Sequence, residues 1–207
     1  MAQIICFANS YKHKNSRCIA GIDLETKEWV RPIGKGTEGA IGTERLINGE
    51  EPQLLDILEI PIGSIANDFG CQPENKILLD GEWRKIGRIS TNDALQYTEE
   101  TKHLLHNFEK SVLASDFNSN ISRGDWKSLQ LIKVKKAHFA KNIWDKLECN
   151  FKYSGHWYLL KTPCPEADNF INSSIDCILT ISMGSAYKKS GDTISHCWKM
   201  VAGIIKL

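Results

Sequence analysis

The sequence lacks several features that would assign it to a class at once. No apolar stretch approaches the roughly 18 residues that a membrane-spanning helix needs. Residues 1–8 carry no basic segment ahead of their apolar side chains, so we expect no signal peptide and a cytoplasmic protein. The net charge is only +1, which by itself indicates no partner. An apolar fraction of 42% and a charged fraction of 25% are typical of globular proteins and argue against disorder.

Cysteine pairs typical of metal sites are also lacking. The seven cysteines include no CxxC pair, their number is odd, and most lie in apolar runs such as residues 4–7. Buried thiols in such runs behave as small hydrophobic side chains. We therefore expect reduced, buried cysteines and neither a metal site nor another cofactor. A zinc site joining Cys164 to His196 and Cys197 is the less favoured alternative.

Signatures of common catalytic sites are absent as well. No G-x-S-x-G motif occurs, and the metalloprotease and EF-hand spacings are missing. The glycine-rich residues 34–39 lack the G-K-[ST] ending of a P-loop, which favours a crossover loop over a phosphate site. We therefore predict a binding module rather than an enzyme. A catalytic site assembled only in three dimensions would leave no such signature.

The sequence does contain many short β-forming segments separated by turn residues. Before residue 90, strands are expected at residues 4–8, 17–23, 28–33 and 54–62, and a hairpin around Asp80-Gly81 at residues 77–89. Beyond residue 125, strands are expected at residues 129–134, 157–160, 175–183 and 195–205, while residues 143–153 are of undetermined type.

One helix is expected between the two groups of strands. Ser90 or Thr91 is a candidate N-cap, and apolar side chains then recur at helical spacing, at Leu104, Leu105, Phe108, Val112 and Leu113. The polar residues 116–125 are typical of a linker. We therefore predict a mainly β protein with one helix. Its first small barrel would span residues 1–90, the connecting helix and linker 91–125, and the second barrel 126–207.

The charges are distributed unevenly along the chain. Residues 116–207 carry 13 Lys/Arg and 8 Asp/Glu, whereas residues 1–115 carry 13 and 17. The basic second half favours a phosphate-rich partner. Lys133 and Lys135 alternate with apolar residues and should share one face of a strand. Together with Trp157 and Lys161 they form our predicted nucleic-acid-binding surface, with an ordinary solvated strand face as the alternative.

A second candidate site lies in the first half of the chain. The polar residues 9–16 form an expected loop, followed by Arg17, and Arg31 lies between the apolar Val30 and Pro32. Such donors fix phosphates or planar carboxylates. The alternative is a structural turn with surface ion pairs.

Several motifs in this chain resemble the bacterial dual OB domain-containing protein family. They are ANSYK at residues 8–12, RCIAG at 17–21, WVRP at 29–32, PQLLDILEIP at 52–61, QPEN at 72–75 and WKMVAGII at 198–205. The likeness spans most of the chain and is strongest before residue 90.

This resemblance implies two OB-like barrels and a nucleic-acid- or nucleotide-binding role, in the context of bacterial defence against invading DNA. If the family's contacts lie in its motifs, the ligand-binding residues here are Asn9, Ser10, Lys12, Arg17, Arg31 and Asn75. The first half is acidic, which favours a compact ligand there over a long phosphate backbone.

We therefore expect a protein that binds single-stranded nucleic acid or a nucleotide-like small ligand. The alternatives are a sensor pocket for a small nucleotide signal, an enzyme acting on nucleotides or nucleic acid, and a protein–protein adaptor that uses an edge strand. The sequence does not distinguish DNA from RNA or from a small nucleotide.

Overall fold

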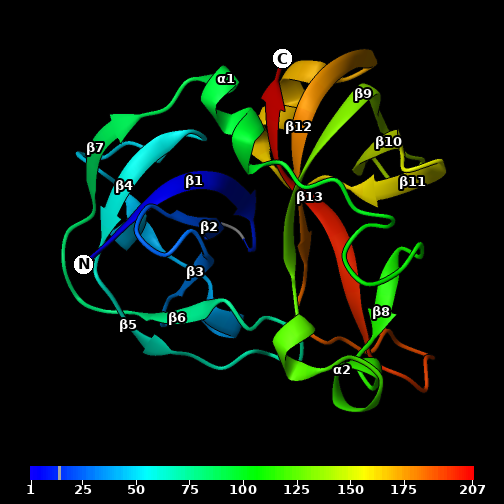
Figure 1. The fold of residues 1–207 in the computed structure, drawn as a ribbon, viewed down its shortest axis with the longest axis horizontal. Helices are drawn as coiled ribbons and strands as arrows, with labels where there is room; N and C mark the ends of the chain where they lie inside the picture. The colour runs from blue at the N-terminus through cyan, green and yellow to red at the C-terminus, as the bar shows by residue number, and fades with distance from the viewer. Residues whose placement is uncertain (14) are drawn as a thin grey trace. The chain divides into compact units, whose positions relative to one another are not determined.

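The computed structural model describes residues 1–13 and 15–207; Lys14, in the predicted polar loop, lies outside them. These residues form two compact units of mainly β structure (Figure 1). The first unit comprises Met1–Asn67 and Glu74–Tyr97, and the second comprises Asp68–Pro73 and Thr98–Leu207. Residues 98–125, most of the predicted connecting segment, thus belong to the second unit.

The strands of the first unit form a barrel. They are β1 (Ala2–Tyr11), β2 (Arg17–Asp23), β3 (Trp29–Ile33), β4 (Asp56–Ile60), β5 (Ile62–Ile65), β6 (Asn75–Leu78) and β7 (Arg84–Arg88). β1, β2 and β3 form an antiparallel meander, β4 pairs with β1, and β6 pairs in parallel with β3. β5 pairs with β6 and follows β4 after the single residue Pro61. The pairing of β6 with β3 therefore closes the sheet into a barrel. The connectivity is that of an OB barrel in which β4 and β5 form one strand interrupted at Pro61.

The hairpin predicted around Asp80-Gly81 is wrong. β6 pairs with β5 and β7 pairs with β4, and the amide of Leu79 donates to the carbonyl of Pro61 at 2.9 Å. β6 and β7 are therefore successive parts of one strand that runs antiparallel to β4 and β5. Asp80-Gly81 forms an irregular excursion from that strand, with Gly81 at φ +150°. Asp80-Gly81 is a bend rather than a hairpin turn, and it joins two strands that continue in one direction.

β1 extends beyond its predicted end, through Asn9 and Ser10 to Tyr11. Both polar side chains are buried there rather than lying in a loop. Opposite β1, a Cβ on Gly21 would lie 2.2 Å from the carbonyl oxygen of Ile5, so only glycine allows the two strands to approach this closely.

The second unit contains the other strands. They are β8 (Ser111–Leu113), β9 (Leu129–Lys141), β10 (Leu147–Tyr153), β11 (His156–Lys161), β12 (Ser173–Met183) and β13 (His196–Lys206). β9, β10 and β11 form a meander, β12 pairs with β9, and β13 pairs with β12. A parallel contact between Lys161 and Met200 closes the barrel from β11 to β13. Both units thus share one connectivity, and the predicted mainly β, OB-like fold is confirmed.

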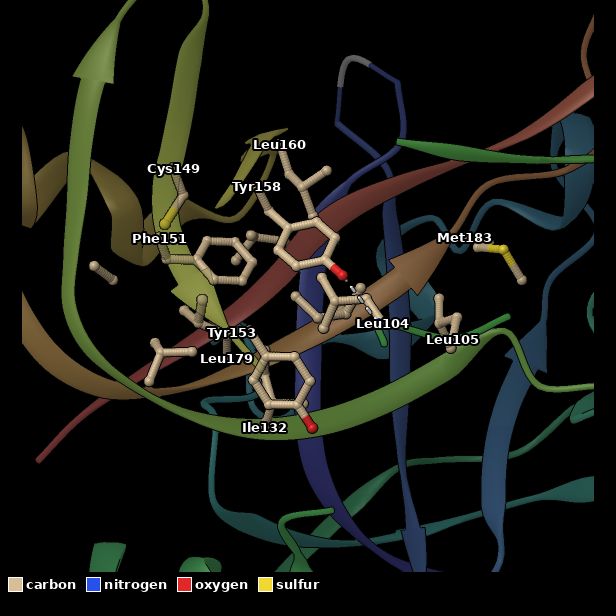
Figure 2. Packing of buried hydrophobic residues seen from close by; sticks show 14 of the residues in the cluster. Leu104, Leu105, Ile132, Cys149, Phe151, Tyr153, Tyr158, Leu160, Leu179 and Met183 are labelled. Atoms are coloured by element: carbon tan, nitrogen blue, oxygen red, sulfur yellow. Dashed lines mark hydrogen bonds between the residues drawn. The ribbon is translucent and has the colours of Figure 1, made fainter. Parts of the chain in front are cut away.

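The core of the second barrel is built from alternating residues of its strands. Phe151 of β10 and Tyr158 of β11 stack with their ring centroids 5.6 Å apart, and the amide of Leu104 donates to the Tyr158 hydroxyl (Figure 2). Each fully buried side chain of this size contributes about 1.5–3 kcal/mol to folding. Because strand side chains alternate, this inward set fixes which residues of β10 and β11 face outward.

The predicted helix begins where expected but is short. Ser90 caps α1 (Thr91–Ala94): its hydroxyl accepts from the amide of Asp93 at 3.1 Å, and the Asp93 carboxylate accepts from the amide of Ser90. A 3₁₀ turn, Leu95–Tyr97, follows and ends the helical segment. A second short helix, α2 (Asp116–Ser119), lies in the predicted linker.

The apolar residues at helical spacing lie in turns and in β8 instead. Their backbone groups bond to side chains of the barrel: the amide of Leu105 donates to Gln130 Oε1 at 2.7 Å, and Lys199 Nζ donates to the carbonyl of Leu104 at 2.8 Å. Barrel side chains thus replace the hydrogen bonds of a helix. None of the described helices is long and apolar enough to cross a membrane.

The seven cysteines are free thiols, all of them buried except the half-buried Cys18. Burial raises the pKa of Cys177 to about 12 and also raises that of Cys149. Thiolates, the form that binds metals or reacts, are therefore disfavoured at these positions. Among the described residues, no group of three or more His, Cys, Asp or Glu side chains is arranged to hold a metal ion.

Candidate nucleic-acid interface

An exposed tryptophan and two lysines share the outer face of β10 and β11. Trp157 is 69% exposed and lies directly opposite Lys152 in the ladder. Farther along β11, Leu159 and Lys161 face the same way, and Asn150 lies opposite Leu159. We call these five residues the β10–β11 face. Cross-strand neighbours lie about 5 Å apart, so the aromatic ring and the ammonium groups form one continuous surface.

This surface offers the chemistry that single strands need. A base stacked on an exposed aromatic ring contributes about 1–3 kcal/mol, and lysines neutralise the backbone. From Trp157 to Lys161 the strand rises about 13 Å. Glu148 lies opposite Lys161 and adds one carboxylate to this end of the face.

The other two predicted residues, Lys133 and Lys135, show the expected alternation. Both are exposed, whereas Ile132 and Val134 are buried. However, β9 pairs with β10 only from His138 to Lys141. The two lysines lie farther back along β9, where the strand pairs with β12. The structure therefore divides the four predicted residues into two pairs, Lys133 with Lys135 and Trp157 with Lys161.

The hairpin between β9 and β10 exposes two further apolar side chains. Ile143 is 88% exposed and Trp144 is 71% exposed. The turn is well bonded: Asn142 Oδ1 accepts from the amides of Trp144 and Lys146, both at 3.0 Å, and Lys141 pairs with Asp145 at 2.9 Å. The tip therefore presents its tryptophan from a defined turn.

Two of the residues predicted to bind a ligand in the first barrel make structural contacts. Arg31 and Glu74 are both buried, and their side chains pair at 2.8 Å. Asn75, opposite Arg31 in the ladder, donates to the carbonyl of Asn67 at 2.8 Å. Removing either partner would take away the opposite charge that faces a buried ionised group, so this pair is part of the folded core. Ligand binding by Arg31 and Asn75 stays a prediction that these contacts do not favour.

Of the remaining predicted ligand residues, Arg17 lies beside the carboxylate of Glu51. Glu51 accepts from Arg45 Nε at 2.8 Å and lies 3.8 Å from Arg17 Nε. Burial opposes ionisation of Glu51, but the hydrogen bond and charge of Arg45 and the charge of Arg17 hold its pKa below the usual value. Asn9 is buried and donates to the carbonyl of Pro52. Ser10 is buried beside it in β1, and Lys12 pairs with Glu38 at 3.0 Å.

The first barrel also has a cleft of about 710 Å³ that none of these residues lines. Its described walls come from the β1–β2 loop, the glycine-rich loop after β3 and the excursion between β6 and β7. The lining residues are His13, Ser16, Gly34, Lys35, Gly36, Thr37, Ala40, Gly42, Glu44, Leu78, Leu79, Asp80, Gly81 and Trp83.

Sequence reasoning favoured a crossover loop over a phosphate site at residues 34–39 and placed residues 9–16 in a candidate ligand site, but it did not join these segments into a cleft. It also did not pick out Asn150 and Leu159. The alternation of buried and exposed residues along β10 and β11 could have identified Asn150 and Leu159. The cleft had no signal of that kind, because segments about 20 to 40 residues apart meet in it only when the barrel closes.

The structure and the sequence comparison give the same fold. Searches of curated proteins and of solved structures found no match. The family model described as "Dual OB-containing domain" matches residues 2–204, almost the whole chain. OB barrels commonly bind oligonucleotides or oligosaccharides on a strand face and its adjoining loops. With two barrels of OB connectivity and a match of this length, the chain belongs to the dual OB-containing domain family.

Proposed function

We propose that the second barrel binds single-stranded nucleic acid along the β10–β11 face. The observation that carries this proposal is Trp157, 69% exposed and directly opposite Lys152, with Leu159 and Lys161 on the same face. An exposed aromatic ring with lysines on the same face suits a base with its phosphates.

The charges support this proposal. Lys152 and Lys161 are exposed, and within the described part of the chain neither forms an ion pair. Lys133 and Lys135 are exposed in the same manner on β9. Cations without a carboxylate partner are free to displace the counterions of a phosphate backbone. In this proposal Trp157 stacks a base, Lys152 and Lys161 neutralise adjacent phosphates, and Lys133 with Lys135 adds weaker contacts to a longer strand.

Fluorescence anisotropy with labelled single-stranded DNA and RNA tests the proposal. We expect Trp157→Ala to weaken binding about 5- to 150-fold, since stacking is worth about 1–3 kcal/mol. Lys152→Glu/Lys161→Glu should also reduce the dependence of binding on salt, because each lost phosphate contact lowers the slope by about 0.7.

Two matched controls separate this face from general effects. Lys188→Glu/Lys206→Glu changes the net charge equally at other exposed lysines, and Trp144→Ala removes an equally exposed tryptophan from the hairpin tip. Both controls should bind much more like the wild type than the face variants do. Salt-independent binding, or equal losses in the face and control variants, would overturn the proposal.

A further inference from the structure

One wall of the cleft in the first barrel is a tightly folded glycine-rich loop. A Cβ on Gly34 or on Gly36 would lie 2.6 Å from the carbonyl oxygen of Ala40, so the loop folds too tightly for side chains there. Hydrogen bonds hold this shape: Gly34 donates to Gly39 at 3.0 Å and Gly36 donates to Ala40 at 3.3 Å. The cleft is thus formed before any ligand arrives, and its volume lies within the range of small-molecule sites.

The lining combines an apolar surface with hydrogen-bonding groups. Leu78, Leu79 and Trp83 supply the apolar part; Trp83 is almost fully buried, whereas Leu79 is 49% exposed. Ser16 and Thr37 add hydroxyl groups. A few polar groups around an apolar surface are typical of sites that hold small organic molecules.

The fixed charges of the described lining disfavour a phosphate. Lys35 is the lining lysine, and it pairs with Asp80 at 2.7 Å. The carboxylate of Glu44 lies against Gly34 and Gly42, near enough that a Cβ on Gly42 would be 2.7 Å from Glu44 Oε2. Two carboxylates therefore outnumber one ammonium group. A phosphate would meet net negative charge, whereas N–H groups of a ligand would find acceptors.

We propose that this cleft binds an uncharged, nucleobase-like heterocycle that packs on Leu79 and Trp83 and donates N–H groups to Glu44. The ligand is small, carries no phosphate and occupies a site separate from the strand-binding face. The Lys35–Asp80 ion pair joins the glycine-rich wall to the opposite wall. Because both side chains are exposed, breaking this ion pair to admit a ligand costs little free energy.

Isothermal titration with guanosine and cytidine, and with their 5′-monophosphates as matched anionic probes, tests this. We expect at least one nucleoside to bind the whole protein with a Kd below about 1 mM, and its monophosphate to bind several-fold more weakly. Leu79→Trp, which fills the cleft from an exposed position, should weaken nucleoside binding at least about tenfold. Ile86→Trp is the control, because Ile86 is similarly exposed on β7 of the same barrel but does not line the cleft.

A substitution of Glu44 tests the role of the lining carboxylates. Glu44→Gln removes one carboxylate, so the nucleoside should bind more weakly while the difference between nucleoside and monophosphate shrinks. Failure of both nucleosides to bind, tighter binding of the monophosphate, or equal losses in Leu79→Trp and Ile86→Trp would each overturn the inference. Lys152→Glu/Lys161→Glu should leave nucleoside binding unchanged, so this test and that of strand binding fail independently.

Discussion

The two barrels share one connectivity but differ in where they place several of their cations. In the first barrel, cations pair with buried or half-buried carboxylates: Arg31 with Glu74, Arg45 with Glu51, and Lys85 and Arg88 with Asp56. In the second, Lys152 and Lys161 stand exposed beside an exposed tryptophan. The same strand order therefore carries buried ion pairs in one unit and exposed lysines on the face of a tryptophan in the other.

This difference explains why arginines near sequence motifs are weak guides to a site. Arg31 belongs to a motif that the family resemblance suggested for ligand binding, but it is buried and its partner is Glu74 of the same barrel. A cation that is already paired and desolvated offers little to a ligand, whereas an unpaired lysine keeps its full charge for a phosphate.

Breaking the Arg31–Glu74 pair should cause the largest loss of stability. In Arg31→Met, Glu74 becomes a buried carboxylate without its cation, and such a change costs about 3–5 kcal/mol. Urea denaturation measures the loss, with Arg84→Met as the control, because Arg84 is largely exposed in the same barrel. If Arg31→Met kept wild-type stability, the pair would not have the structural role assigned to it here.

Lys199 is the exception in the second barrel, since this lysine is buried. Its Nζ donates to the carbonyl oxygens of Leu104 and Asn107 and to Asn107 Oδ1, all within 2.8 Å. Burial lowers its pKa to about 7. The unfolded chain holds this proton up to about pH 10.4. Between pH 7 and 10 the unfolded state therefore binds more protons, and the free energy of unfolding rises with pH.

The expected rise from pH 7 to pH 9 is about 2 kcal/mol, because one proton corresponds to at most about 1.4 kcal/mol per pH unit. Urea denaturation at the two pH values measures it. Lys199→Met should lack this rise, and the difference between the two proteins removes the contribution of other groups. Parallel pH profiles for the two proteins would show that Lys199 stays charged in the fold.

Much of the fold could be predicted from the sequence because the strands alternate and turn residues separate them. β2 has the predicted bounds, and β12 and β13 lie within two residues of theirs. The helix prediction was wrong beyond Tyr97 because apolar spacing reports only which side chains are buried. Leu104 and Leu105 are indeed buried, but Gln130 and Lys199 from distant strands satisfy the backbone around them.

The candidate sites were less predictable for a related reason. Trp157 and Lys161 lie on one strand, so their shared face follows from alternation alone. Their relation to Lys133 and Lys135 depends on where β10 stops pairing with β9, and the cleft depends on closure of the first barrel. Both depend on pairing between strands that are distant in the sequence, and the local pattern of apolar and polar residues does not reveal such pairing.

The two pairs of lysines in the second barrel should contribute unequally to strand binding. Lys152→Glu/Lys161→Glu removes cations next to Trp157, so we expect a loss of at least about tenfold and a smaller salt slope. Lys133→Glu/Lys135→Glu changes the same charge on the stretch of β9 that pairs with β12, and its loss should be several-fold smaller. Anisotropy titrations at two salt concentrations measure both. A larger loss in the β9 variant would move the binding surface to that strand.

The smallest expected effect lies in the capping box of α1. Ser90→Ala removes the acceptor for the amide of Asp93 and should lower stability by about 1 kcal/mol, whereas Ser90→Asn, another good N-cap, should restore most of it. Urea denaturation measures both variants. Because Ser90 belongs to the first unit, its loss should leave strand binding by the second barrel unchanged. A weaker Kd for single strands in Ser90→Ala, at temperatures where the protein is folded, would show that the two units do not act independently.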